Sequence, residues 1–395
     1  MEKTIYLDHA ATTPLDREVF EKMMPWFTDH YGNPSSIYRL GRTAKNAVEQ
    51  ARDQVAALIN SRDSEVFFTS GGTESDNWAI KGVAYANKDK GRHIVTTNIE
   101  HHAVYDTCRH LEKNGFTVTY VPVGKNGIVD PSDIQKAIGR ETILITVMAA
   151  NNEIGTIQPI QDIGGIARER NIIFHTDAVQ TAGTLPIDVK KLQVDMLSLS
   201  AHKFYGPKGT GVLYVRKGTK MDSLFHGGGQ EKTRRASTEN VPGIVGLSHA
   251  LEKANKNMDR NNTHLKKLRD ELVDRVLGRI PFTIYNGDRD LRLPGNANFA
   301  FEFVEGESLL LLLDHLGIMA SSGSACTSGS LEPSHVLLAL GLTHEVAHGS
   351  LRVSFGLDNH MGEIGTIVDA IASSVEKLRD MSPLYEDHLK RNRSD

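Results

Sequence analysis

The stretch from about residue 65 to residue 216 alternates short apolar runs with longer amphipathic segments. The segments at 103–114 and 160–170 have the length that a right-handed crossover between parallel strands requires. This alternation predicts an α/β fold built on a mainly parallel open sheet. The expected strands are Glu65–Ser70, His93–Asn98, Thr117–Val123, Thr142–Ala149, Ile172–Asp177, Met196–Ser200 and Gly211–Arg216.

Four of these expected strands end in polar residues, namely Ser70, Asn98, Asp177 and Ser200. In an open α/β sheet, ligands bind outside the carboxyl ends of the strands. We therefore expect the chemistry of this protein at that edge of the sheet.

The pattern changes after Val241. A long helical stretch at 244–279 precedes expected strands at 282–285, 297–304 and 351–355, with helices at 307–316 and 363–379. These elements predict a smaller α+β part of the chain. The polar residues 388–395 predict a frayed tail.

Composition excludes several classes of protein. The 395 residues carry 45 Lys and Arg against 49 Asp and Glu, a net charge of −4, so nothing favours a nucleic-acid partner. Two cysteines, Cys108 and Cys326, are too few for the disulfide framework of a secreted scaffold. No signal-peptide pattern opens the chain, and apolar runs such as 309–313 are too short to span a membrane. We therefore expect a reduced, cytoplasmic protein without a membrane anchor.

The segment Ser70–Asp76 follows a strand and opens a helical pattern. Its glycines, Gly71 and Gly72, would let the backbone approach a phosphate at a helix N-terminus. The plainer alternative is that Thr73 and Asp76 form an ordinary helix-capping pair.

Two further strand ends carry candidate functional groups. The carboxylate of Asp177 needs a partner if it is buried, either a cationic ring nitrogen of a cofactor or an ordinary capping or salt-bridge group. The segment 196–203 brings Ser200, His202 and Lys203 to one strand end before a glycine-rich turn at 206–209. A lysine there can form a Schiff base, although most lysines lie in solvated loops.

Cys326 lies in a run of small residues, 320–330, which predicts an exposed loop where a thiolate can act as nucleophile. Cys108 falls in a helical stretch and is expected to pack in the core. The segment His344–His348 matches the zinc-protease pattern, but a β-like run follows at once and leaves little helix, so no metal site is expected. Residues 226–229 resemble an esterase oxyanion loop, but the chain has no Gly-x-Ser-x-Gly nucleophile elbow.

Taken in order, these segments resemble the pyridoxal 5′-phosphate (PLP) cysteine desulfurases of the NifS/IscS type. The resemblance extends over nearly the whole chain. Its matching motifs lie at 6–8, 11–14, 32–36, 100–101, 151–153, 177–180, 200–203, 322–327 and 331–334.

The resemblance implies an aspartate-aminotransferase-like fold (fold type I) that works as a homodimer. A large PLP-binding domain would span 15–260, and a small domain carrying the cysteine loop would comprise 1–14 and 261–395. Lys203 would hold PLP covalently, and His101 would stack on the ring and assist proton transfer. The remaining cofactor contacts would come from Gly72, Thr73, Asn152, Asp177, Gln180, Ser200, His202 and, from the other subunit, Thr238.

The implied reaction converts L-cysteine to L-alanine. Cys326 would take the sulfur as a persulfide and pass it to an iron–sulfur scaffold or another acceptor protein. Arg352, with Asn33, would hold the substrate carboxylate, a task that suits a bidentate guanidinium. The alternatives are a selenocysteine lyase of the same fold, a zinc peptidase and a catalytically silent scaffold subunit; Cys326 favours the desulfurase, because attack on sulfur needs a thiol.

The sequence departs from the family in the segment 226–240, where relatives commonly have Gly in place of Thr233 and Ser237. A residue with a side chain has a higher energy than Gly at positive φ. Any positive φ at Thr233 or Ser237 would therefore cost stability.

Overall fold

The computed structural model describes residues 4–323 and 333–392. The cysteine loop predicted around Cys326 falls largely in 324–332, outside the described residues. Among the residues that are described, no helix is both long enough and apolar enough to cross a lipid bilayer.

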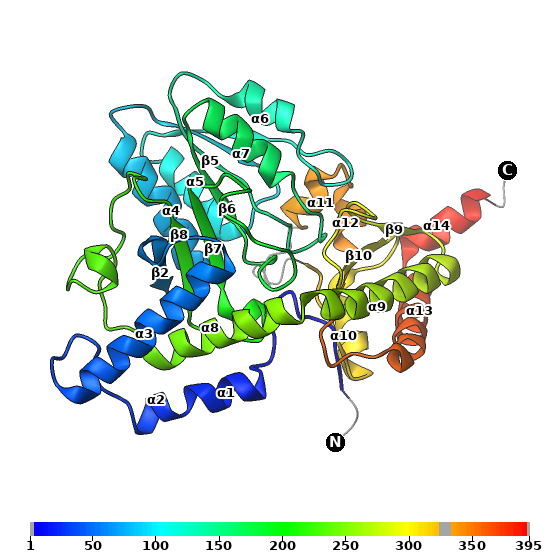
Figure 1. The fold of residues 1–395 in the computed structure, drawn as a ribbon. Coiled ribbons are helices and arrows are strands. Elements are labelled where there is room, and N and C mark those ends of the chain that lie inside the picture. Colours follow the sequence, from blue (N-terminus) through cyan, green and yellow to red (C-terminus); the bar gives the residue numbers. More distant parts are fainter. Residues whose placement is uncertain (1–3, 324–332, 393–395) are drawn as a thin grey trace.

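A seven-stranded sheet forms the centre of the larger part of the molecule (Figure 1). The strand order is β2-β8-β7-β6-β5-β3-β4, and only β8 runs opposite to the other strands. The sheet confirms the predicted α/β fold and all seven predicted strands. These are β2 (Val66–Thr69), β3 (His93–Thr97), β4 (Thr117–Val121), β5 (Thr142–Thr146), β6 (Ile173–Asp177), β7 (Met196–Ser200) and β8 (Gly211–Val215).

Both faces of this sheet are covered by helices. Successive side chains of a strand point to opposite faces, and the central strands here carry buried apolar side chains on both. Val95 and Ile145 pack on one face with α3 (Arg39–Leu58), α6 (Pro131–Ala137), α7 (Ile160–Glu169) and α8 (Val241–Lys256). Their neighbours Ile94 and Leu144 pack on the other face with α4 (Gly72–Asn87) and α5 (His102–Glu112). This arrangement buries β2, β7 and β8 completely and leaves the carboxyl ends of the parallel strands free to build a site.

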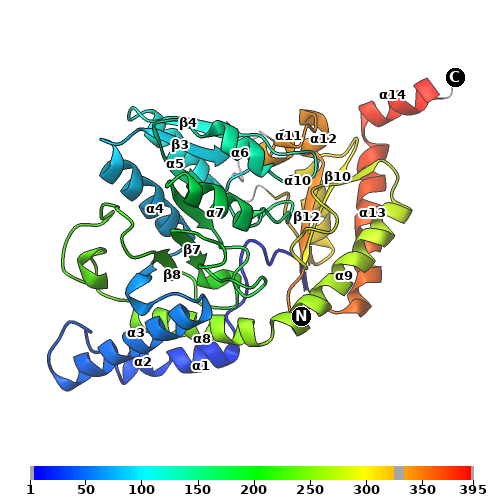
Figure 2. The same ribbon diagram turned by 45° about the horizontal axis from the view of Figure 1, so that its top comes forward.

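The smaller part contains a three-stranded antiparallel sheet of order β12-β10-β9. It packs with three helices on a separate apolar core, and Figure 2 shows two of these, α9 and α13, side by side. The elements confirm the predicted α+β pattern: β9 (Thr283–Tyr285), β10 (Asn296–Phe301), β12 (Ser350–Ser354), α9 (Met258–Arg279), α10 (Gly306–His315) and α13 (Ile364–Asp380). The N-terminal strand β1 (Ile5–Tyr6) pairs with β11 (Ile318–Met319) beside them.

The helical stretch predicted over 244–279 is confirmed and consists of two helices, α8 and α9, which are separated at Asn257. The prediction for the C-terminal tail was wrong. Residues 388–392, predicted as a frayed tail, belong to α14 (Pro383–Asn392). There the His388 ring lies 5.0 Å from the ring centres of both Phe282 and Phe303, and these contacts hold the end of the chain.

The remaining helices are short. They are α1 (Arg17–Met23), α2 (Pro25–Thr28), α11 (His335–Ala339) and α12 (His344–His348). Helix α12 covers the zinc-protease-like segment with five residues, and β12 begins two residues later, as the sequence indicated.

The loop 226–240 contains the backbone strain that its sequence implies. Thr233 has φ of 66° and Ser237 has φ of 108°, both in the region that favours glycine. Two ion pairs hold this loop against α3 and α4: the buried pair of Arg52 with Glu231, and the pair of Glu74 with the half-buried Arg235.

We expect Ser237→Gly to raise the free energy of unfolding by about 1 kcal/mol, because the strain removed exceeds the backbone entropy that glycine adds. Chemical denaturation of the two proteins would measure the difference. Ser373→Gly, in the exposed interior of α13, is the matched control and should lower the free energy of unfolding by roughly 0.5 kcal/mol. Equal destabilisation by both changes would contradict the assignment of strain to Ser237.

Candidate active site

A cavity of about 290 Å³ lies at the carboxyl edge of the large sheet, where the sequence predicted the chemistry. Its walls come from segments that follow β2, β3, β5, β6 and β7, from the N-terminal segment, and from Arg352 of β12. The structure brings ten of the predicted site residues together here: Gly72, Thr73, His101, Asn152, Asp177, Gln180, Ser200, His202, Lys203 and Arg352.

One end of the cavity is the N-terminus of α4. The predicted capping pair of Thr73 and Asp76 is absent, because the N-cap Gly71 makes no side-chain cap and Asp76 is buried within the helix. A Cβ placed on Gly72 would lie 2.7 Å from Cγ2 of Val179, so the packing there requires glycine. Free N–H groups at a helix start, beside the lining residues Ser200 and His202, suit an anion such as phosphate.

The buried carboxyl of Asp177 lies at the end of β6, and its Oδ1 accepts a hydrogen bond from the Val179 N–H at 2.9 Å. Burial raises the pKa of Asp177 to about 6. Burial, and then the charge of Asp177, also raise the pKa of the neighbouring Asp76, so these two carboxyls oppose each other's ionisation. A cation bound at Asp177 would hold it ionised at neutral pH.

The amine of Lys203 lies against the N-terminal segment of the chain. Its Nζ donates to the carbonyl oxygens of Ala10 at 2.5 Å and Ala11 at 2.8 Å. Gln180 Nε2 donates to the same Ala10 oxygen at 3.0 Å. Sequence reasoning missed Ala10 as a wall of the site; the motif at 11–14 was the nearest signal.

His101 is the N-cap of α5, and its Nδ1 accepts from the Ala103 N–H at 3.1 Å. Burial, followed by the positive charge of Lys203, lowers the pKa of His101 to about 4. The ring is therefore neutral near pH 7, and because Nδ1 accepts a hydrogen bond, its proton is assigned to Nε2. His101 can then donate a hydrogen bond from Nε2.

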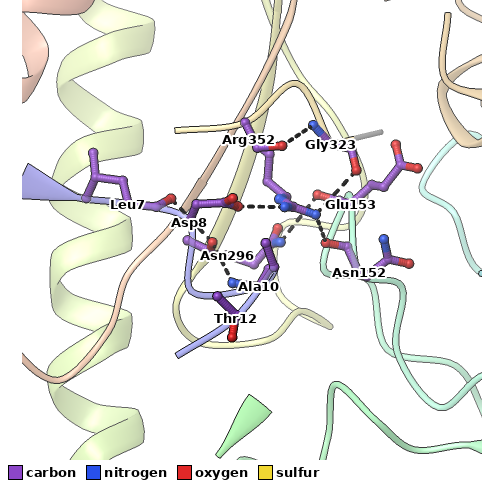
Figure 3. A network of polar contacts seen from close by, with 12 residues as sticks. Leu7, Asp8, Ala10, Thr12, Asn152, Glu153, Asn296, Gly323 and Arg352 are labelled. Carbon is purple, nitrogen blue, oxygen red and sulfur yellow. Dashed lines mark hydrogen bonds and ion pairs between the residues drawn. The ribbon is translucent and has the colours of Figure 1, made fainter. Parts of the chain in front are cut away.

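Arg352 supplies a buried cation on the opposite wall, and only 2% of its side chain is exposed (Figure 3). Its guanidinium pairs with Asp8 at 2.6 Å and donates to the carbonyl oxygens of Asn152 at 3.0 Å and Gly323 at 3.3 Å. A desolvated guanidinium beside an open cavity suits a carboxylate ligand.

Two predicted residues that the structure describes, Asn33 and Thr238, do not line this cavity. Asn33 is exposed in the loop before α3, and its side chain accepts from the Ser35 N–H at 2.9 Å. Thr238 is exposed and lines a different hollow with Ser70 and Arg235. Cys326 lies outside the described residues, whereas Cys108 is buried as predicted.

Comparison with known proteins identifies the family. Residues 5–367 match the Aminotransferase class-V family model. A cysteine desulfurase IscS from Methanosarcina thermophila is 57% identical over 382 residues, which cover 97% of this chain and 94% of that protein. A solved NifS-like protein is 39% identical with a TM-score of 0.89, and the match covers 95% of this chain and all of that one. A second structure, SspA in complex with cysteine, is 39% identical with a TM-score of 0.80 and covers 89% of this chain and 99% of that chain. The chain belongs to the class-V aminotransferase family and, within it, to the PLP-dependent cysteine desulfurases.

Proposed function

We propose that this cysteine desulfurase transfers the sulfur of L-cysteine to Cys326 and releases L-alanine. In this step the Cβ–S bond of the substrate breaks and an S–S bond to Cys326 forms, so a persulfide replaces the thiol. The observation that carries the proposal is one cavity that gathers an amine, a buried carboxyl, a neutral imidazole and a guanidinium, from Lys203, Asp177, His101 and Arg352.

The cavity residues fit PLP. The uncapped start of α4, with the close packing that requires glycine at position 72, supports a phosphate site completed by Thr73, Ser200 and His202. The buried carboxyl of Asp177 would pair with the cationic ring nitrogen of the cofactor. When bound, the cofactor supplies an electron sink that lets bonds next to the substrate amino group break.

The other predicted cofactor contacts surround the same space. Gln180 would bond the ring hydroxyl and Asn152 would support the ring from the side, while both side chains line the cavity. His101 would lie against the ring and assist proton transfer, and its neutral state lets Nε2 donate a hydrogen bond there. Lys203 would carry the cofactor. Its hydrogen bonds to the carbonyl oxygens of Ala10 and Ala11 hold the amine at the cavity wall before the cofactor binds.

Arg352 would hold the substrate carboxylate. Its burial supports this role, because a carboxylate gains more from a guanidinium that water does not solvate. Asn33 would assist, although it lies outside the cavity of its own chain.

A homodimer would account for the two outlying residues, Asn33 and Thr238, if each contributes to the site of a partner subunit. Large apolar side chains near Asn33 in the sequence are exposed in the single chain: Phe27 is 58% exposed, Tyr31 69% and Ile37 89%. Exposed apolar side chains that lie together are typical of a surface that another protein covers. A second copy of this chain would bury them.

The separate apolar cores support most of the proposed division into a large domain, 15–260, and a small domain, 1–14 and 261–395. The exception is α11 and α12, which pack in the core of the large domain through Val336, Leu337 and Ala347. We further expect a cytoplasmic enzyme that delivers its sulfur to an iron–sulfur scaffold or another acceptor protein. That expectation follows from the family and from the reduced state that a reactive thiol needs.

Borohydride reduction of the purified holoenzyme tests the proposed function. We expect a visible absorption band that is lost on reduction, with the cofactor-derived mass on Lys203 when peptides are analysed by mass spectrometry. Lys208, five residues away, is the internal control and should stay unmodified. A protein that stays colourless and unmodified after incubation with PLP would overturn the proposal.

A further inference from the structure

Asp8 belongs to the N-terminal segment that crosses between the two parts of the molecule. After β1, the segment runs beside β12: Asp8 forms a bridge with Ser354, and the Ser354 N–H donates to Leu7 O at 2.8 Å. The same segment then contacts the cavity through Ala10 and Ala11. These backbone contacts fix Asp8 beside the side chain of Arg352, as Figure 3 shows.

One N–H donor of the Arg352 guanidinium, at Nε, has no acceptor among the described residues. Nη1 donates to the carbonyl oxygens of Asn152 and Gly323, and Nη2 donates to Asp8 Oδ1 at 2.6 Å. The Nε atom itself is buried. A buried N–H without an acceptor costs free energy, so this donor marks where a ligand oxygen belongs.

We infer that Asp8 is a positioning residue that holds the plane of the Arg352 guanidinium so that its Nε edge receives the substrate carboxylate. The inference rests on the proposed role of Arg352. Asp8 itself does not line the cavity, and its side chain is 19% exposed against 2% for Arg352. It therefore acts on the substrate through the arginine and touches neither the substrate nor the cofactor.

The geometry explains why Asp8 matters in addition to the two carbonyl groups. Both carbonyl oxygens hold the same nitrogen, Nη1, so by themselves they allow the guanidinium plane to tilt about that point. The bond from Nη2 to Asp8 adds the second fixed point that defines the plane. A bidentate carboxylate contact depends on that orientation, because two N–H groups must align with two oxygens at once.

Two substitutions separate orientation from charge. Asp8→Ala removes the acceptor and should raise KM for L-cysteine at least tenfold while kcat changes less than threefold. Asp8→Asn keeps an acceptor oxygen but removes the charge, and should restore KM to within threefold of the native value. Titration of each holoenzyme with L-alanine, followed by cofactor absorbance, should show the same pattern in Kd without any desulfuration.

Asp195→Asn is the matched control, because Asp195 is also a buried acid paired with an arginine, Arg216, and does not line the cavity. It should leave KM and the Kd for L-alanine unchanged. A normal KM in Asp8→Ala, a lowered KM, or Asn behaving like Ala would each overturn the positioning role. If the native enzyme shows no desulfuration of L-cysteine, the proposed function is refuted instead. The Kd for L-alanine would then still test whether Asp8 positions Arg352.

Discussion

Cys326→Ala is expected to reduce desulfuration of L-cysteine by at least about 10³-fold, because the variant has no thiol to accept the substrate sulfur. Cofactor absorbance and the Kd for L-alanine should stay close to native values, since neither depends on that thiol. Sulfide release under reducing conditions and mass spectrometry of the persulfide would measure the loss.

The described ends of the cysteine loop support this expectation. Gly323 lines the cavity and bonds to Arg352, while Ser334 donates to Glu153 Oε2 at 2.5 Å. Cys326 is the third residue after Gly323 in the sequence, and three residues of chain span at most about 11 Å. The loop therefore starts at the cavity wall, and its length allows the thiol to approach a bound substrate.

Cys108→Ala is the matched control for the cysteine prediction. Cys108 is fully buried in α5, and burial raises the pKa of its thiol, so it is not a reactive thiolate at neutral pH. Its replacement should keep desulfuration within about threefold and lower stability by roughly 1 kcal/mol through the small cavity it leaves. Retained activity in Cys326→Ala would place the sulfur acceptor elsewhere and refute the persulfide step.

The sequence was sufficient to predict the large sheet because its strands are apolar on both faces and end in polar residues. Asp177 and Ser200 show the reason clearly. Each is the last residue of a buried strand, and the two strands are parallel neighbours, so both residues lie at the same edge of the sheet. Ligands bind at that edge in open α/β sheets, which is why the position of the site could be predicted. Local pattern and global fold agree at these positions.

Contacts between distant segments could not be predicted in the same way. The Ala10 and Ala11 carbonyl groups reach Lys203 across about 190 residues of sequence, and Asp8 reaches Arg352 across 344. Helix α14 is likewise fixed by rings of Phe282 and Phe303, far from it in sequence. No local periodicity encodes such contacts, because tertiary packing decides them.

Asp177→Asn is expected to weaken PLP binding roughly 100-fold at pH 7 and to lower turnover by about 10³-fold or more, because no carboxylate then balances a cationic ring nitrogen. Equilibrium titration of the cofactor-free protein with PLP would measure binding directly. Asp195→Asn, a buried acid that does not line the cavity, should leave both quantities nearly unchanged.

The pH dependence of PLP binding follows from the same carboxyl. Burial raises the pKa of Asp177 to about 6 in the cofactor-free protein. Below that pH, PLP must displace a proton from the carboxyl before it can pair with it, so the Kd should rise about tenfold between pH 7 and pH 5. The cofactor phosphate also titrates near pH 6. The contribution of Asp177 to the change in Kd is therefore the change measured for the native protein minus the change measured for Asp177→Asn.

The same substitution should stabilise the protein without cofactor. The folded pKa of Asp177 lies above its unfolded value, so the native fold loses stability from this group as the pH rises from about 4 through 6. Asp177→Asn removes that cost and still accepts the hydrogen bond from Val179, so the cofactor-free variant should gain about 1–3 kcal/mol at pH 7.5 and almost nothing at pH 4. Thermal denaturation at the two pH values would measure both. A lower stability of the variant at pH 7.5 would show that Asp177 stabilises the fold and would contradict this prediction. A higher stability at pH 7.5, together with weaker PLP binding, would mean that the buried acid destabilises the cofactor-free fold and serves cofactor binding.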